Sequence, residues 1–167
     1  ERIPTHGGSI RGYVKKIEGK EKISPKVNEL VELEKKLQLH NSNTYKKYFK
    51  SIEFKSNELN KLLKTILKDS KTIAGYGAPA KATTLMHHFG IDNKVIKYII
   101  DDSPWKQGMY SPGLHIPVYD RSKLYDNPTD YVIILAWNFS DNIISNNSKY
   151  SQLGGKFIVP LPTLKVI

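Results

Sequence analysis

The feature that most constrains the fold is a glycine-containing stretch at residues 73–81, which reads Ile-Ala-Gly-Tyr-Gly-Ala-Pro-Ala-Lys. An apolar run enters this stretch, and a segment with helical periodicity follows it. Gly75, Gly77 and Ala80 therefore form the pattern G-x-G-x-x-A between a predicted strand and a predicted helix. The first glycine permits a tight turn, the second lets a phosphate approach the backbone, and the small third residue lets the helix pack closely. The same pattern also occurs in βα turns that bind no ligand.

The start of the following helix is a candidate anion site. Pro79 suits the first helical position, because its missing N–H is one that a helix start leaves unpaired. The remaining N–H groups and the positive helix end would face a phosphate, with Lys81 one turn further on. We therefore expect the backbone of Gly75, Tyr76, Gly77 and Ala78, together with Lys81, to bind a phosphate group.

The segment from residue 71 onward alternates between short apolar runs and short helical patterns. Strands are predicted at residues 72–74, 95–100, 116–118, 131–136 and 156–159, and helices at 79–89, 121–125 and 140–150. Strands that alternate with helices indicate a parallel sheet, and runs that are apolar on both faces indicate strands covered by helices on both sides. The sequence thus predicts an α/β, doubly wound, Rossmann-like domain at residues 71–167, with a mostly parallel sheet of about five strands.

Residues 1–70 form a separate region in this prediction. A short alternating strand is expected at residues 9–14, with partners that lie outside this chain. The pair Ser24-Pro25 is a helix-start signature, and a longer amphipathic helix is expected from Thr44 to about Lys68. Apolar residues at this spacing favour core or helix–helix packing over a ligand site.

Composition narrows the class of protein. The chain has 167 residues, a net charge of +10 and no cysteine, so a disulfide framework and a thiolate metal site are excluded. Residues 1–70 carry 16 of the 26 Lys and Arg, mostly Lys interleaved with Glu, and Arg is scarce; this pattern argues against nucleic acid as a partner. No apolar run approaches about 18 residues, so no membrane span is expected and a cytoplasmic location is the default.

Three loops should meet at the carboxyl edge of the predicted sheet, where ligands bind in open α/β folds. Asp101 or Asp102 ends the second strand, where dinucleotide sites place a carboxylate for ribose hydroxyls. Because Asp-Ser-Pro also forms turns, one of the two aspartates could instead cap a turn. Lys106 is available to a phosphate and could equally be solvated.

Aromatic, amide and imidazole side chains complete the list of candidates. Trp137 and Tyr76 could stack on a base or only cover the sheet edge. Asn138 could bind a ligand or act as a helix N-cap. His115 could reach a ligand from beside the second loop, and His6, next to two glycines, is the strongest candidate for a catalytic histidine.

The ordered set of motifs resembles the C-terminal domain of the S-adenosylmethionine (SAM)-dependent C-methyltransferases that act on nucleotide-linked deoxysugars. The matching segments are His6–Arg11, Gly75–Lys81, Asp101–Pro104, Lys106–Gly108, Pro112–Gly113, His115–Pro117, Leu135–Phe139 and Gly154–Pro162. The likeness spans nearly the whole chain.

The resemblance implies an enzyme that removes a proton next to a sugar keto group and adds the SAM methyl to that carbon. In such enzymes a zinc-binding N-terminal region and a SAM-binding domain precede the domain seen here. This chain has no zinc cysteines, no SAM glycine loop and no Tyr-x-Glu-His segment for the base. It therefore resembles the terminal third of such an enzyme, without a metal of its own, with the SAM site in the preceding part of the polypeptide.

The resemblance also implies that this domain holds the nucleotide part of a dTDP- or GDP-type sugar, and that its partners are the N-terminal domains of the same polypeptide. Residues 1–70 would then be the end of the preceding methyltransferase domain plus a connector. The main alternative is an NAD(P)-binding domain of an oxidoreductase, which shares the first βα turn. A second alternative is a nucleotide-binding or interaction module without catalytic function.

Overall fold

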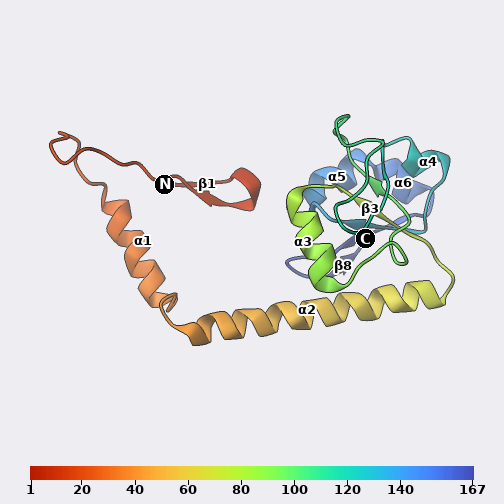
Figure 1. The fold of residues 1–167 in the computed structure, drawn as a ribbon, viewed down its shortest axis with the longest axis horizontal. Helices are drawn as coiled ribbons and strands as arrows, with labels where there is room; N and C mark the ends of the chain where they lie inside the picture. The colour runs from red at the N-terminus through yellow and green to blue at the C-terminus, as the bar shows by residue number, and fades with distance from the viewer. The chain divides into compact units, whose positions relative to one another are not determined.

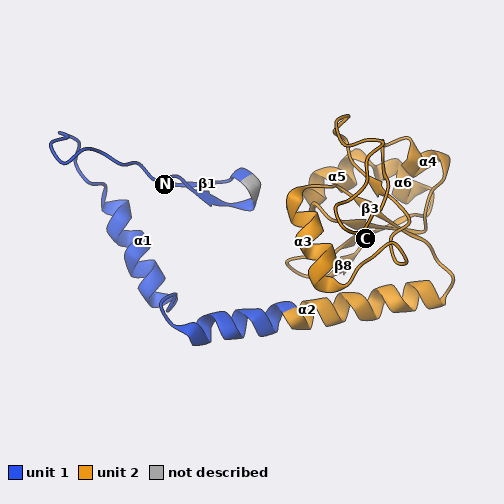
Figure 2. Ribbon diagram, in the orientation of Figure 1, with its two compact units in different colours: residues 1–52 blue, residues 53–167 orange. Residues whose placement is uncertain are grey.

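The chain divides into two compact units in the computed structural model, residues 1–52 and residues 53–167 (Figures 1 and 2). The structure describes residues 1–167 apart from the side chain of His6, so the candidate catalytic role of His6 lies outside the described residues. The division falls inside a long helix, whereas the sequence suggested a boundary after residue 70. The functional division at residue 70 stays a prediction.

The first unit contains a small hairpin and a helix. Strand β1 (Arg2–Ile3) pairs antiparallel with β2 (Ser9–Ile10), and the 3-10 turn η1 (Thr5–Gly7) lies between them. The expectation that the strand near residue 9 has its partners outside the chain is therefore wrong, and the strand is shorter than expected. The reversal of the chain is helped by Gly8, which has φ +121°.

Helix α1 (Pro25–Lys36) begins as the sequence predicts. The Ser24 Oγ accepts a hydrogen bond from the Lys26 amide at 3.3 Å, and Pro25 occupies the first helical position. Helix α2 (Ser42–Lys68) starts two residues before the expected Thr44, where the Asn41 side chain accepts a hydrogen bond from the Asn43 amide. The C-terminal part of α2 belongs to the second unit.

Residues 53–167 contain a six-stranded sheet. Its strands are β3 (Ile73–Tyr76), β4 (Ile99–Ile100), β5 (Val118–Tyr119), β6 (Tyr131–Ile134), β7 (Lys156–Val159) and β8 (Lys165–Val166), in the order β5-β4-β3-β6-β7-β8. The pairs from β5 through to β7 are parallel, and β8 pairs antiparallel with β7. The predicted doubly wound, mostly parallel, Rossmann-like sheet is confirmed, and β8 is a strand that the sequence prediction missed.

The helices of this unit also depart from the prediction in detail. They are α3 (Ala80–Phe89), α4 (Lys123–Asp126), η2 (Trp137–Phe139), α5 (Ser140–Asn146) and α6 (Ser148–Gln152). Pro79 has extended backbone angles and is the N-cap of α3, so the expectation that it occupies the first helical position is wrong. The single helix expected at 140–150 is divided at Asn147, whose backbone is not helical.

Alternate residues of the strands face opposite sides of the sheet, and both sides are buried. On one side Ala74 and Tyr76 join a core cluster with Tyr150 and Phe157. On the other side a side chain at Gly75 would meet Leu135 and Ile99, so this glycine gives the sheet room to pack. Burial on both sides explains why the strand sequences read as continuous apolar runs.

The strand order reverses at the centre of the sheet. The chain runs outward from β3 to β4 and β5, and then returns to form β6 on the other side of β3. Crossover connections of this kind are right-handed, so α3 and the α5–α6 pair cover opposite faces. Ligands in such folds bind beyond the carboxyl ends of the strands at this reversal. In the described part of the chain, no helix combines the length and the apolar character needed to cross a bilayer.

Candidate functional site

A cavity of about 350 Å³ lies beyond the carboxyl ends of β3, β4 and β6. We call it the switch-point cavity, because it lies where the strand order reverses. It is lined by Tyr76, Gly77, Pro79, Asp101, Asp102, Lys106, Ala136, Phe139, Asn142, Ile143, Asn146 and Asn147. Both halves of the sheet thus contribute to its walls.

A second cavity of about 220 Å³ lies beside the first, and we call it the α3 cavity. It is lined by Ala78, Pro79, Ala82, Thr83, Met86, Ile99, Lys106, Met109, Tyr110, Ser111, Pro112 and Val118. Pro79 and Lys106 line both cavities, so the two are neighbours.

Asp101 is buried at the end of β4, and its carboxylate is held by three donors. It accepts hydrogen bonds from the Ala78 amide at 2.6 Å and the Ser103 amide at 2.9 Å. The Lys106 Nζ lies 3.1 Å from its Oδ2 and forms an ion pair. Asp101 therefore combines the turn-capping role with a place in the cavity wall.

The amides of the glycine stretch already have partners within the protein. The Gly75 amide donates to the Tyr98 carbonyl and the Gly77 amide to the Ile100 carbonyl. The Ala78 amide donates to Asp101. Three amides of the predicted phosphate cradle, those of Gly75, Gly77 and Ala78, are thus engaged in internal hydrogen bonds.

Gly77 serves the packing of the site. Its φ is +90°, a conformation that L side chains rarely adopt, and a Cβ atom there would lie 2.6 Å from the Ala136 Cβ. The ends of β3 and β6 can therefore approach closely only with glycine at this position.

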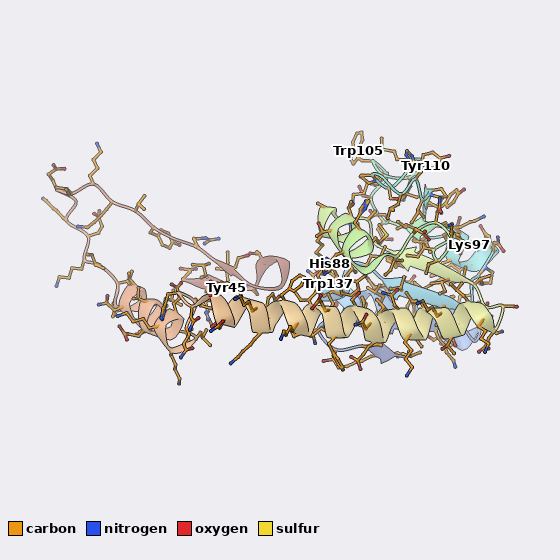
Figure 3. The ribbon with its side chains drawn as sticks, turned by 60° about the horizontal axis from the view of Figure 1, so that its bottom comes forward. Tyr45, His88, Lys97, Trp105, Tyr110 and Trp137 are labelled. Atoms are coloured by element: carbon orange, nitrogen blue, oxygen red, sulfur yellow. The ribbon has the colours of Figure 1, made fainter. Side chains whose placement is uncertain are left out.

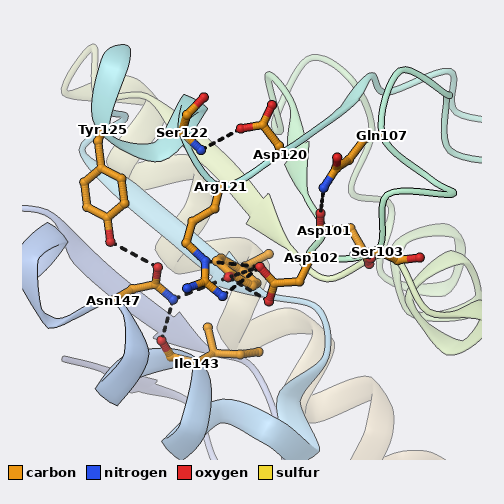
Figure 4. Close-up of polar contacts among 11 residues, drawn as sticks. Asp101, Asp102, Ser103, Gln107, Asp120, Arg121, Ser122, Tyr125, Ile143 and Asn147 are labelled. Carbon is orange, nitrogen blue, oxygen red and sulfur yellow. Dashed lines mark hydrogen bonds and ion pairs between the residues drawn. The ribbon is translucent and has the colours of Figure 1, made fainter.

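Asp102 lies at the centre of a polar network that faces the switch-point cavity (Figure 4). The Arg121 guanidinium donates to it from Nε at 3.1 Å and from a terminal nitrogen at 2.9 Å. The hydroxyl of buried Tyr76 donates to the same carboxylate at 3.1 Å. The Tyr76 hydroxyl in turn accepts a hydrogen bond from the side-chain amide of Asn147 at 3.4 Å. Burial raises the pKa of Tyr76, so the hydroxyl stays protonated as a donor. The Asp102 side chain is 53% exposed and remains accessible to a ligand.

Lys81, Trp137 and Asn138 form a group of their own. The Lys81 Nζ donates to the Asn138 Oδ1 and lies 4.4 Å from the centre of the Trp137 ring, in a cation–π arrangement. Burial lowers the pKa of Lys81. None of the three is among the residues that line either cavity.

The structure therefore divides the predicted site residues. Five of them line the switch-point cavity together: Tyr76, Gly77, Asp101, Asp102 and Lys106. Ala78 lines the α3 cavity, and Gly75 is buried within β3. His115 is exposed, has φ +51° and lines neither cavity.

Sequence reasoning missed Arg121 and the amide-bearing residues of α5. Arg121 pairs with Asp102 only because β5 lies beside β4, a register that the sequence does not reveal. Asn142 and Asn146 stand four residues apart, which places them on one face of α5, and Asn147 directly follows the helix. That spacing, directly after a predicted strand, was the available signal. Among the described residues, no group of three His, Cys, Asp or Glu side chains is placed to hold a metal ion.

The strand order and the cavity at its reversal define a Rossmann-like α/β domain. Residues 4–162 match the sequence model of the C-methyltransferase C-terminal domain family, and the chain belongs to this family. The resemblance seen in the sequence motifs is thereby confirmed.

Two known proteins show the extent of the similarity. C-methyltransferase NovU of Streptomyces niveus is 32% identical over 162 residues, which cover 97% of this chain and 39% of NovU. The chain thus spans about two fifths of that relative's length. The solved structure of UDP-D-quinovosamine 4-dehydrogenase from Vibrio fischeri is similar with a TM-score of 0.41 and 15% identity, over 58% of this chain and 93% of that one.

Proposed function

We propose that this chain is the C-terminal domain of a SAM-dependent C-methyltransferase that acts on a nucleotide-linked keto-deoxysugar. In this proposal the second unit binds the nucleoside diphosphate part of the substrate. Membership of the C-methyltransferase C-terminal domain family supports the reaction class. The observation that carries the binding role is the cavity of about 350 Å³ at the strand-order reversal, with Asp102 and Lys106 in its wall.

The proposal assigns the chemistry to the rest of the enzyme. SAM, the base that removes the proton and the zinc of the N-terminal region would all belong to the preceding part of the polypeptide. The share of this domain would be to hold the substrate so that the sugar carbon faces the methyl donor, which is a positioning contribution to the rate.

The charges around the switch-point cavity suggest a role for each group. The Asp101 charge is compensated by two amides and Lys106, whereas Asp102 is exposed and accepts only from Arg121 and Tyr76 among the contacts described. A carboxylate in this state can accept a further hydrogen bond from a hydroxyl group of the nucleotide sugar. The Lys106 side chain is 41% exposed and retains donors for a phosphate oxygen.

Isothermal titration calorimetry of the 167-residue chain with dTDP and GDP tests the proposal. We expect saturable binding of at least one of them, and weaker or no binding of SAM. Lys106→Ala should weaken that binding by roughly tenfold, because it removes a charge-assisted contact. Lys94→Ala is the matched control, since Lys94 is exposed and lines neither cavity. Absence of binding by the wild-type chain, or equal losses in the two variants, would refute the proposed site.

The NAD(P)-binding alternative rests on a specific observation. The order of β3 to β8 matches the 3-2-1-4-5-6 order of dinucleotide-binding sheets, with an acidic residue after the second strand. An NADH titration decides between the two: NADH binding that is tighter than dTDP and GDP binding would favour the oxidoreductase class.

A further inference from the structure

The α3 cavity has a lining that differs from that of the switch-point cavity. Carbon-rich side chains of α3, β4 and β5 line it, including Ala82, Met86, Ile99 and Val118, and most of the remaining lining comes from the loop between β4 and β5. Its volume of about 220 Å³ is sufficient for a planar heterocycle and too small for a whole nucleotide. The function proposed above involves the switch-point cavity and gives no role to the α3 cavity.

Lys106 stands at the junction of the two cavities. It lines both, and its Nζ lies 3.1 Å from the Asp101 Oδ2. A ligand that occupied both cavities would pass this ammonium group between its two ends. Such a ligand would meet mostly apolar groups in the α3 cavity, the Lys106 ammonium group between the cavities, and hydroxyl and amide groups in the switch-point cavity.

The rim of the α3 cavity carries apolar side chains in contact with water. Met109 is 61% exposed and Tyr110 is 64% exposed, and both line the cavity from the loop between β4 and β5. Figure 3 labels Tyr110 and Trp105, which both belong to this loop. Trp105 on the same loop is 85% exposed and lines neither cavity. A flat ring seated in the α3 cavity would cover the apolar surface of Met109 and Tyr110 and leave Trp105 in water.

One polar group inside the α3 cavity can add a hydrogen bond to such a ring. Ser111 is buried, and its hydroxyl oxygen accepts a hydrogen bond from the Ile116 amide at 3.0 Å. The O–H of this serine therefore remains a donor that could face a carbonyl or ring nitrogen of a base.

We propose that the α3 cavity binds the nucleobase of a nucleoside diphosphate, with the phosphates at Lys106 and the attached sugar in the switch-point cavity. This inference rests on the proposed function, and it specifies which end of the substrate enters which cavity. It departs from the sequence-based expectation, which gave the nucleoside to Asp101 and Asp102 or to Trp137 and Asn138; none of these four residues lines the α3 cavity. Base stacking on an aromatic ring contributes a substantial share of nucleotide affinity, and it tolerates different bases.

The two methionines of the chain provide a direct test. Met86 and Met109 are the only methionines in the sequence, and both line the α3 cavity. With ¹³C-labelled methionine methyl groups, both NMR signals should shift saturably on titration with dTDP. Inorganic pyrophosphate, which has no base, should leave both signals nearly unchanged at concentrations that saturate the phosphate site. Intermolecular contacts between a methionine methyl and the thymine protons should be detectable.

Two variants of the loop between β4 and β5 distinguish stacking of the base on Tyr110 from a nonspecific effect of changing this loop. Tyr110→Ala should weaken dTDP binding by about tenfold in calorimetry, because it removes the ring at the rim. Trp105→Ala, the matched control, should leave the affinity unchanged. Both residues are exposed, so neither change removes buried core.

The outcomes distinguish this inference from the proposed function. If dTDP binds and Lys106→Ala weakens it, but the methionine signals respond no more to dTDP than to pyrophosphate, the base lies elsewhere and only this inference fails. Equal effects of Tyr110→Ala and Trp105→Ala would also overturn it. If neither dTDP nor GDP binds to the wild-type chain, both the inference and the proposed function fail.

Discussion

Gly77 shows how a residue that the sequence motif assigns to ligand binding can serve packing. The motif predicts that the second glycine leaves room for a phosphate. In the structure the space that a side chain would need is filled by Ala136, and the amide of Gly77 donates to the Ile100 carbonyl. The glycine is therefore required by the contact between the ends of β3 and β6, whether or not a ligand is bound.

Replacement of Gly77 by alanine should destabilise the second unit by about 2–4 kcal/mol, because backbone strain and a clash with Ala136 add together. Gly154→Ala is the matched control. Gly154 has φ +91°, nearly the same as Gly77, but nothing lies within 4 Å of the Cβ that alanine would add. The control should lose only about 1–2 kcal/mol of strain. Urea unfolding curves measure both values, and equal losses would show that packing against Ala136 is unimportant.

At this scale the sequence predicts residue types better than residue partners. Asp101, Asp102 and Lys106 were identified as members of one site, and the structure brings them to one cavity. Their partners could not be inferred, because the Asp102–Arg121 ion pair depends on strand register and the Asp101–Ala78 contact on the path of a loop.

Helix α2 contributes part of the core of the second unit. Its C-terminal part supplies Leu59, Leu63 and Ile66 to the core of the second unit. The Asn60 side chain also donates to the Phe89 carbonyl at the end of α3, at 2.8 Å. The helical spacing of apolar residues in this segment predicts core packing, and this is confirmed for Leu59, Leu63 and Ile66.

Truncation of Leu63 should therefore cost the second unit about 2–4 kcal/mol, because a fully buried leucine leaves a cavity. Phe54→Ala, on the same helix within the same unit, is the comparison. Phe54 is 63% exposed, so its truncation should change the free energy of unfolding by less than about 0.5 kcal/mol. Denaturant unfolding followed by circular dichroism gives both numbers. Similar values for the two variants would mean that α2 does not pack on the sheet.

Element boundaries were predicted less well than element types. The strand β8 was missed because it has only two residues and follows a segment that contains Pro160 and Pro162. The helix expected at residues 140–150 breaks at Asn147, where the side chain turns inward and donates to the Ile143 carbonyl. A buried side-chain amide that donates to a carbonyl of the preceding helical turn cannot be recognised from periodicity alone.

On the scale of the whole sheet, a cluster at the amino ends of β3 and β6 joins the two halves. The Asp130 carboxylate accepts hydrogen bonds from the Thr72 amide at 2.8 Å and the Thr72 hydroxyl at 2.9 Å. The Lys71 Nζ lies 2.9 Å from the same carboxylate. These contacts, the Thr72 amide first, lower the pKa of Asp130 from 3.8 to about 2.

Because the folded pKa of Asp130 lies below its unfolded value, its contribution to stability is fully present above about pH 4 and is lost as the pH falls through 2. Asp130→Asn should lower the free energy of unfolding at pH 7 by about 1 kcal/mol, a value reduced for the partial exposure of the group. The wild-type and variant values should converge between pH 4 and pH 2. Asp126→Asn, an exposed change nearby, should have little effect at any pH. Unfolding curves at several pH values that stay parallel would contradict this.

The reversal of strand order also affects when, during folding, the switch-point cavity can form. The central pair joins Ile73 to Tyr131. Everything between them, including β4 and β5, forms a contiguous half that can compact first and shorten the effective loop. Tyr76 and Asp102 belong to this half, whereas Phe139 and Asn142 come from the half that follows it. A nascent chain with only its first half folded therefore has one wall of the switch-point cavity, and the cavity itself forms only when the second half has folded.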